Sequence, residues 1–355
     1  MTLANIRVRE VAKQLSLSPG TVSKALRGRL GQVSLATTKT VLNYCRNQGT
    51  ISKPDVDRIL FKMVSNSSGK NIFCISGKDI DIYSNISSSI SNFIQGYGQY
   101  TSYYKARNEN ELSGFPFSKT GSLVVLGRLP MEVLLAFKRY DIPMVLVDNR
   151  INEEMGVSTV SSENLRGVSK SVKILADLGH KKIAFLRLFE DHGRAYNLSQ
   201  RYDGYVLGMI RAGLSFDDLI FQRESKIDYQ LQSHDSAVSE LRELANDVLS
   251  LKDRPTAIIA VNDLTAYVVR QVATEKGLRV PEDLSIIGYD GWHRMPAFSL
   301  FADPVSTMVV NWDEIGMQAA NLAVELMTTP NIQPKHLEVP VTYEDAGTVA
   351  VPGGK

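Results

Sequence analysis

The sequence predicts an α/β protein in which a small helical head precedes a larger core of alternating strands and helices. Apolar residues recur with helical spacing in residues 1–49, whereas short apolar runs alternate with helical stretches in residues 71–348. The longest apolar runs, such as Ala257–Val261, are far shorter than the roughly 20 residues of a membrane helix. A hydrophobic content of 43% and a charged content of 22% are ordinary for a globular chain of two or three units.

Charge is distributed unevenly along the chain. Residues 1–53 contain nine Lys or Arg residues and one acidic residue, a net charge of +8, although the whole chain carries only +2. The remaining residues therefore carry −6, from 31 basic and 37 acidic side chains. A basic block at one end is typical of a nucleic-acid-binding module. The alternative is a small helical bundle with a basic surface and no contact with DNA.

Three short helices are expected in residues 1–49. The first carries the helically spaced apolar residues Val8, Val11, Ala12 and Leu15. The second follows a Ser18 cap, has Pro19 in its first turn and ends at Gly28; the third begins after Ser34. Two helices joined by a tight turn predict a helix-turn-helix unit.

The outward face of the second helix has a composition suited to DNA. Hydroxyl groups bind phosphates, and Lys or Arg side chains reach guanine edges in the major groove. The residues expected on this face are small, hydroxylic or basic: Gly20, Thr21, Ser23, Lys24 and Arg27.

A family resemblance is carried by Val8–Lys13, Leu17–Leu26 and Val33–Ser34. Together these stretches resemble the DNA-binding head of the lac repressor/galactose repressor family. The resemblance implies that bases are chosen at Pro19 and Gly20. Because neither side chain can hydrogen-bond a base edge, Lys24 and Arg27 are expected to carry more of the base readout. The resemblance also implies phosphate contacts from Ser18, Thr21, Ser23 and Ser34.

Residues 50–70 are expected to form a hinge and linker that depart from the family pattern. The family's hinge helix inserts an apolar side chain into the minor groove, and such wedges kink a base step. Here the proline is displaced, and Asp55 and Asp57 would face phosphates unfavourably. Leu60 is the expected wedge, with Ile59 and Phe61 as rivals. The alternative is that no hinge helix forms over residues 54–61.

Residues 71–348 are expected to form two similar doubly wound halves. Six short apolar runs predict buried parallel strands: 72–75, 123–126, 144–147, 183–186, 257–261 and 285–287. Helical stretches are expected at 84–100, 130–140, 164–178, 201–212, 236–250 and 263–276. The first half is placed at about 71–162 plus 304–330, and the second at about 163–303 plus 335–348. Open sheets of this kind bind ligands at the carboxyl ends of their strands.

The core resembles the same family at residues 178–185, 201–205, 255–263 and 277–290. The resemblance implies a periplasmic-binding-protein-like core, with an effector in the interdomain cleft bound by Arg201, Asn262 and Asp290. A guanidinium, an amide and a carboxylate suit the hydroxyls of a carbohydrate. Asp263 is expected to cap the following helix, and the aromatic rings of Trp292 and Tyr229 are candidates to face a sugar. The alternatives are that Asp290 only ends a strand, Arg201 pairs with Asp203, and Trp292 is a core residue.

Several residues depart from the family pattern around the expected cleft. Ser162 stands where many members have an Asp, and Arg166 and Arg187 add positive charge. These arginines indicate either an acidic effector or simply solvated side chains. Near the C-terminus, the family's usual Arg is replaced by Glu344 and Asp345, so a different pairing of the last strand is possible.

The remaining features argue against an enzyme. The chain has two cysteines, Cys45 and Cys74, which excludes a disulfide framework or a cysteine-based zinc site. No phosphate-binding loop, metalloprotease or esterase motif is present, and His180 in a Gly-His turn is expected to be structural. No metal or cofactor is expected, and the N-terminus lacks a signal-peptide pattern, which favours the cytoplasm.

The sequence therefore predicts a DNA-binding transcription regulator. It is expected to be a repressor that binds a palindromic operator as a homodimer, with no membrane association, and that is controlled by a carbohydrate-type effector. No heptad repeat follows Thr348, so a dimer is favoured over a zippered tetramer. The alternative is a small-molecule-binding protein whose degenerate head binds any duplex, weakly and with strong salt dependence.

Overall fold

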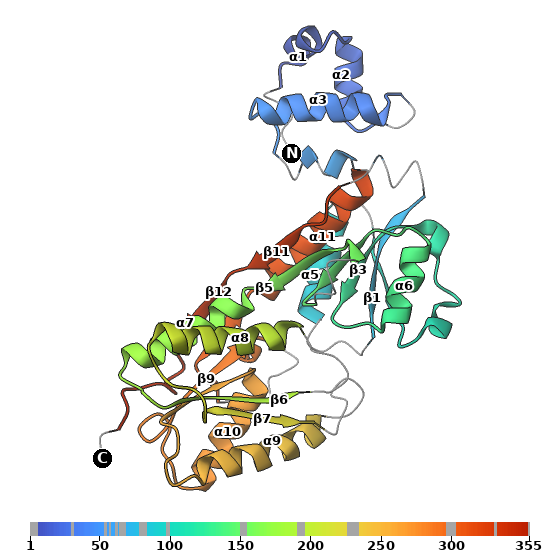
Figure 1. Ribbon diagram of the computed structural model, residues 1–355. Coiled ribbons are helices and arrows are strands. Elements are labelled where there is room, and N and C mark those ends of the chain that lie inside the picture. Colours follow the sequence, from blue (N-terminus) through green and yellow to red (C-terminus); the bar gives the residue numbers. More distant parts are fainter. Residues whose placement is uncertain are drawn as a thin grey trace. The chain divides into compact units, whose positions relative to one another are not determined.

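The structure is a computed structural model of the 355-residue chain (Figure 1). The residues it describes are 6–29, 32–52, 55–56, 58–60, 63, 69–77, 84–96, 100–149, 155–189, 196–225, 234–295, 303–329 and 332–353.

The head contains the three expected helices, α1 (Val8–Gln14), α2 (Pro19–Leu26) and α3 (Leu35–Asn47) (Figure 1). Ser18 and Ser34 are the N-cap residues of α2 and α3, and each side chain accepts a hydrogen bond of 3.0 Å from an amide three residues later. The predicted apolar faces meet in one buried cluster that includes Val11, Val22 and Leu42.

A further helical segment follows α3. The residues described as helical in this segment are 55, 56, 58, 59, 60 and 63. The structure therefore has helix in the hinge region, contrary to the alternative that none forms. Val56, Ile59, Leu60 and Met63 belong to the same buried cluster as the helices of the head.

The first sheet has six strands in the order β11-β5-β4-β3-β1-β2. Register pairs show that β1 to β5 are joined in parallel. The strands are β1 (Asn71–Ser76), β2 (Ser102–Lys105), β3 (Thr120–Leu126), β4 (Met144–Val147), β5 (Ser158–Ser162) and β11 (His336–Val339).

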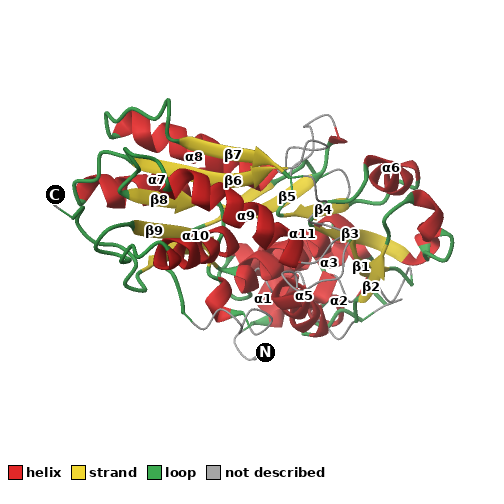
Figure 2. Cartoon of the chain, turned by 90° about the horizontal axis from the view of Figure 1, so that it is seen from below, coloured by secondary structure: helices red, strands yellow, loops and turns green. Residues whose placement is uncertain are grey.

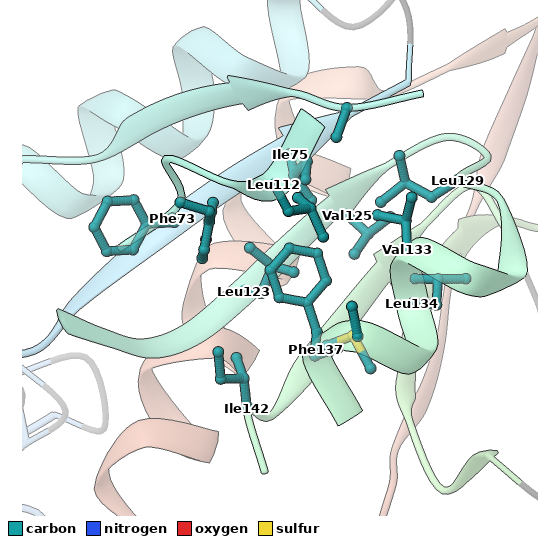
Figure 3. Close-up of a cluster of buried hydrophobic side chains, with 14 of the residues drawn as sticks. Phe73, Ile75, Leu112, Leu123, Val125, Leu129, Val133, Leu134, Phe137 and Ile142 are labelled. Atoms are coloured by element: carbon teal, nitrogen blue, oxygen red, sulfur yellow. The ribbon is translucent and has the colours of Figure 1, made fainter. Parts of the chain in front are cut away.

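Helices cover both faces of the first sheet. On one face α6 (Met131–Arg139) packs Phe137 against Leu123 and Val125 of β3 in a buried cluster, drawn in Figure 3. On the other face are α5 (Ser84–Gln95) and α11 (Trp312–Thr328), and Ser122 of β3 donates a 2.9 Å hydrogen bond to a carbonyl of α11. Two 3-10 turns, η2 (Glu109–Leu112) and η3 (Phe117–Lys119), precede β3.

The second sheet repeats the plan in the order β12-β10-β9-β8-β6-β7. Strands β6 to β9 lie side by side (Figure 2), and only the β10–β12 pair is antiparallel among the described pairings. Its strands are β6 (Ile183–Phe189), β7 (Ile220–Glu224), β8 (Ala257–Ala260), β9 (Ser285–Asp290), β10 (Thr307–Val310) and β12 (Val341–Glu344). Helices α7 (Asn164–Asp177) and α8 (Tyr196–Arg211) cover one face; α9 (His234–Leu249) and α10 (Asp263–Glu275) cover the other (Figure 1).

The chain divides into two compact units, 1–160 plus 313–337 and 161–312 plus 338–355. Residues 304–312 were expected in the first half, but β10 pairs with β9 and β12 and therefore belongs to the second. Among the described residues, no helix is long and apolar enough to cross a membrane.

Candidate functional site

The face of α2 that was expected to contact DNA is open to solvent. Pro19, Gly20, Lys24 and Arg27 are exposed, whereas Thr21 and Ser23 are half-buried. Ser18 and Ser34 are also exposed, and each hydroxyl lies 2.8 Å from the Thr hydroxyl three residues later. The structure thus brings the predicted base-reading and phosphate-binding residues of α2 onto one capped helix.

Leu60 has a different setting. Its side chain is 6% exposed and lies in the buried cluster of the head, next to the 7% exposed Ile59. Leu60 therefore does not stand free as a wedge in this structure. Its rival Phe61 lies outside the described residues.

In the second unit, two predicted effector residues form a buried ion pair. Arg201 is 2% exposed, and its Nη2 donates a 2.7 Å hydrogen bond to Oδ1 of Asp290, the last residue of β9. Burial raises the pKa of the Asp290 carboxyl, and the charge of Arg201 opposes that shift. The alternative pairing of Arg201 with Asp203 is wrong, since the Arg201 guanidinium is directed to Asp290.

Three contacts of Arg201 were not foreseen from the sequence. Its Nε donates to Oδ1 of Asn164 at 2.8 Å, and its guanidinium carbon lies 3.9 Å from the ring centroid of Tyr289. A third hydrogen bond of 2.8 Å runs from Nη1 to the carbonyl of Val261. These contacts hold the guanidinium rigidly at the carboxyl ends of β8 and β9. Tyr289 directly precedes Asp290, which was the only sequence signal for its position.

The expected cap of α10 is wrong by one residue. Asn262, not Asp263, is the N-cap, and its Oδ1 accepts hydrogen bonds from the amide and the hydroxyl of Thr265 at 2.9 and 2.8 Å. Both residue types cap helices well, so composition could not separate them. Asn262 is half-buried at the end of β8, the position expected for an effector contact.

Asp263 instead holds the turn that follows Asp290. Its Oδ2 accepts a 2.7 Å hydrogen bond from the Trp292 amide, and its Oδ1 a 2.6 Å hydrogen bond from the Thr307 hydroxyl. Asp290 has a φ of 109° and Gly291 a φ of 76°, a backbone conformation that is costly for Asp290. Burial and the nearby charge of Asp290 raise the pKa of Asp263 to about 7.

The two aromatic candidates have different outcomes. Trp292 is only 3% exposed, and its ring is buried beside Asp290 rather than open to a sugar. Tyr229 lies outside the described residues.

The additional charged residues are mostly paired locally. Arg166 is exposed and forms an ion pair of 2.9 Å with Glu163. Arg187 is half-buried: it donates two hydrogen bonds to Oε1 of Gln222 and lies over the Tyr202 ring at 4.8 Å. Burial lowers the pKa of Arg187.

The unusual acids near the C-terminus have partners of their own. Glu344 pairs with two residues of the 3-10 turn η5 (Trp292–Arg294): with His293 at 2.8 Å and with Arg294. Asp345 accepts a 2.7 Å hydrogen bond from the Ser306 hydroxyl. These acids therefore stabilise the segment next to Asp290.

His180 lies between two structural partners. Its Nε2 is 2.8 Å from the carbonyl of Ala350, and its Nδ1 is 2.8 Å from the Thr256 hydroxyl. Because a carbonyl only accepts, Nε2 is the donor and Nδ1 accepts from Thr256. Burial lowers the pKa of His180, and no group of three potential metal ligands occurs among the described residues.

Comparison with known proteins agrees with this architecture. Residues 172–347 match the family described as "Periplasmic binding protein-like domain". The HTH-type transcriptional repressor CytR of Escherichia coli K12 is 27% identical over 328 residues, which cover 90% of this chain and 89% of CytR. The repressor PurR of Glaesserella parasuis is 30% identical over 227 residues, 63% of this chain and 61% of that protein. These matches agree with the resemblance of the chain to the lac repressor/galactose repressor family.

Solved structures of transcriptional regulators share the fold. The transcriptional regulator CelR in complex with cellobiose has a TM-score of 0.64 at 19% identity, over 97% of this chain and 100% of CelR. A LacI-family regulator from Enterococcus faecium with bound ribose has a TM-score of 0.63 at 18% identity, over 79% of this chain and 99% of that one. At sequence identities this low, the similarity to these structures shows the fold alone.

Proposed function

We propose that this protein is a transcriptional repressor that binds a palindromic operator as a homodimer and is controlled by a carbohydrate-type effector. The observation that carries the proposal is the pairing of two features in one chain. Residues 1–53, with a net charge of +8, expose Lys24 and Arg27 at a capped helix, and a separate α/β unit holds Arg201 and Asp290 at the carboxyl edge of its sheet.

In the head, Lys24 and Arg27 are the base-reading residues. Lys24 lies in the last turn of α2 and Arg27 is its C-cap residue, and the exposed N-terminal residues Pro19 and Gly20 of this helix can approach the groove without a bulky side chain. Ser18, Thr21, Ser23 and Ser34 bind phosphates and set the position of the helix. The names of the relatives CytR and PurR support repression rather than activation.

In the second unit, Asp290 and Asn262 bind hydroxyl groups of the effector. Arg201 acts mainly through Asp290, because its hydrogen bonds to Asn164, Val261 and Asp290 hold the guanidinium against the carboxylate. The bound ribose and cellobiose of the structural neighbours favour a carbohydrate. The effector shifts DNA affinity only through a difference in its affinity for two conformations, typically about 1–3 kcal/mol.

The deciding experiment is selection of binding sites from a random duplex library, with the full-length protein at near-physiological salt. Recovery of two inverted half-sites supports the proposal. A pool without any motif, together with binding that falls steeply as salt is raised, would instead favour the alternative of a ligand-binding core with a non-specific head.

A matched variant makes the selection more specific. Arg27→Ala removes an exposed charge from α2, whereas Arg46→Ala removes one from the last turn of α3. If α2 reads bases, only the first variant changes the recovered motif.

The effector can be identified by measurements on the same full-length protein. Thermal shifts are measured with a panel of neutral and acidic mono- and disaccharides, and each hit is added to the operator complex. A carbohydrate that raises the melting temperature and changes operator affinity is the effector; loss of that response in Asp290→Asn locates it.

A further inference from the structure

Arg187 of β6 lies among aromatic rings and not in open solvent. Phe185, Arg187 and Phe189 are alternate residues of the strand and therefore share one of its faces. The guanidinium carbon of Arg187 lies 4.8 Å from the ring centroid of Tyr202 in α8 and 5.7 Å from that of Phe189. Because the side chain is half-buried, its charge has already lost part of its hydration, unlike that of a solvated surface arginine.

The charge of Arg187 is not neutralised by a bound carboxylate. Its Nε and Nη2 both donate to one neutral acceptor, Oε1 of Gln222, at 3.0 and 2.7 Å. Asp203 is exposed and acts on Arg187 only as a more distant charge. Within the described part of the chain, no carboxylate forms an ion pair with Arg187, and no acceptor is bound to its Nη1. Its remaining N–H donors can therefore bind an oxyanion.

Arg223 on the neighbouring strand has the opposite arrangement. Gln222 of β7 is the register partner of Arg187, and Arg223 is the next residue, so its side chain lies on the other face of the sheet. There it forms ion pairs of 2.7 Å with both Glu243 and Asp247 of α9. A partly buried charge is costly without a partner. The protein supplies two carboxylates to Arg223, so the setting of Arg187 favours an anion that comes from outside the chain.

The position of Arg187 along its strand is level with the contacts of Arg201. Leu186 is the register partner of Ala260, the last residue of β8. Arg187 is therefore level with Val261, whose carbonyl accepts a 2.8 Å hydrogen bond from Arg201. Both guanidinium groups thus lie near the carboxyl edge of the second sheet.

Helix α8 also connects Arg187 with the candidate effector residues. Its consecutive residues Arg201 and Tyr202 contact the Asp290 carboxylate and the Arg187 guanidinium, respectively. Strands β6, β8 and β9 are neighbours in the sheet (Figure 2), so β6 and β9 are about 10 Å apart at the usual strand spacing. A monosaccharide with a charged substituent is long enough to bridge such a separation.

We propose that the effector carries a phosphate or carboxylate group, and that Arg187 binds this group while Asp290 and Asn262 bind hydroxyls. This inference rests on the proposed function, because it gives a chemical class to the effector of the same site. An oxyanion receives charge-assisted hydrogen bonds from the guanidinium, whereas a neutral sugar leaves that charge without a counterion. Arg187 is therefore the residue that selects an anionic carbohydrate over its neutral parent.

Titration calorimetry of the full-length protein with matched carbohydrates tests the selection. Ribose 5-phosphate is compared with ribose, and glucose 6-phosphate and glucuronate are each compared with glucose. At least one anionic sugar is expected to bind about ten- to a hundredfold more tightly than its neutral parent. Whether the phosphate esters or the uronate show this preference identifies the oxyanion.

The same titrations separate failure of this inference from failure of the proposed function. If neutral sugars bind as tightly as their anionic counterparts, or more tightly, the anionic class is wrong while control by a carbohydrate stands. If no sugar binds, the carbohydrate effector of the proposed function is wrong, and this inference with it.

Two variants locate the charge that selects the anion. Arg187→Gln and Arg223→Gln each remove one positive charge from neighbouring strands. Only Arg187→Gln is expected to weaken binding of the anionic sugar, by about tenfold or more, and it should leave the neutral parent unaffected. Equal losses for anionic and neutral sugars would give Arg187 a structural role only. Equal losses in both variants would mean that general positive charge, and not contact with Arg187, attracts the anion.

A conservative variant keeps the test available if Arg187→Gln does not fold. Arg187→Lys retains the charge but loses the planar fork of donors. It is expected to weaken binding of the anionic sugar alone. Wild-type affinity for the anionic sugar in Arg187→Lys would contradict oxyanion binding by the guanidinium.

Discussion

The head and the second unit use their basic side chains in opposite ways. Lys24 and Arg27 lie exposed on α2, whereas Arg201 is 2% exposed and its guanidinium is bound to Asn164 and Asp290. An exposed charge costs little to keep and contributes when DNA supplies a partner. A buried charge must be paired within the protein at all times. A change at Lys24 or Arg27 can therefore alter DNA binding without altering stability, whereas a change at Arg201 alters the stability of the second unit as well as its binding.

The largest expected effect is the loss of the buried pair. Asp290→Ala leaves the Arg201 guanidinium buried without its carboxylate, so unfolding should become easier by about 3–5 kcal/mol. Urea denaturation measures this loss. Asp283→Ala is the matched control, since it removes one partner of the Arg279–Asp283 pair, in which Arg279 is exposed. Equal destabilisation by both variants would mean that burial does not set the difference.

A pH-dependent effect is expected for Asp263. Its pKa of about 7 in the folded protein lies above the ordinary value of 3.8, so the folded state binds more protons between those values. The wild type should thus lose stability as pH rises from about 4 to 7, by an amount on the order of 4 kcal/mol. Asp263→Asn keeps a neutral partner for Trp292 and Thr307 and should lack this loss.

Melting temperatures of both proteins from pH 4 to 8 provide the measurement. The melting-temperature curves of the two proteins are expected to diverge as pH rises, because only the wild type loses stability. Parallel curves would show that Asp263 stays ionised in the fold.

His180 should act in the opposite pH direction. Burial lowers its pKa in the folded protein, so the unfolded chain binds more protons and the wild type loses stability as pH falls below about 6.5. His180→Ala removes that dependence, and it costs about 1–3 kcal/mol at pH 8 because the Ala350 carbonyl and Thr256 hydroxyl lose their partner. The exposed His336, bonded to Thr159, is the control: a loss in His336→Ala as large as in His180→Ala would contradict this prediction.

The sequence predicted strands made of apolar residues better than strands made of polar ones. Apolar runs located β1, β3, β4, β6, β8 and β9. In contrast β5, with the sequence Ser-Thr-Val-Ser-Ser, is buried at every residue although four of its side chains are polar. Its burial comes from neighbours distant in sequence, such as Lys335, whose carbonyl accepts from the Thr159 amide at 2.8 Å. No local pattern carries that information.

At the candidate effector site, the sequence indicated two residues that lie together, Arg201 and Asp290, but not their contacts. Family resemblance selected Arg201 and Asp290, and the parallel sheet predicted that the ends of β8 and β9 lie at one edge. That Arg201 reaches Asp290 depends on how α8 packs over the sheet, where Gly204 allows close approach to α7. The helical segment after α3 shows the same limit: Leu60 or Ile59 was expected to contact DNA, but both lie in the buried cluster of the head.

The smallest effect on stability, and the sharpest test of the comparison, concerns α2. Lys24→Ala and Arg27→Ala are expected to leave the melting temperature unchanged, because both side chains are exposed. Each should reduce discrimination at defined operator positions by about 1–3 kcal/mol. Arg46→Ala removes the same charge from α3 and should weaken all duplexes alike or not at all. If all three variants weaken every sequence equally, α2 contributes charge but no base readout, and the difference between the head and the second unit is one of burial alone.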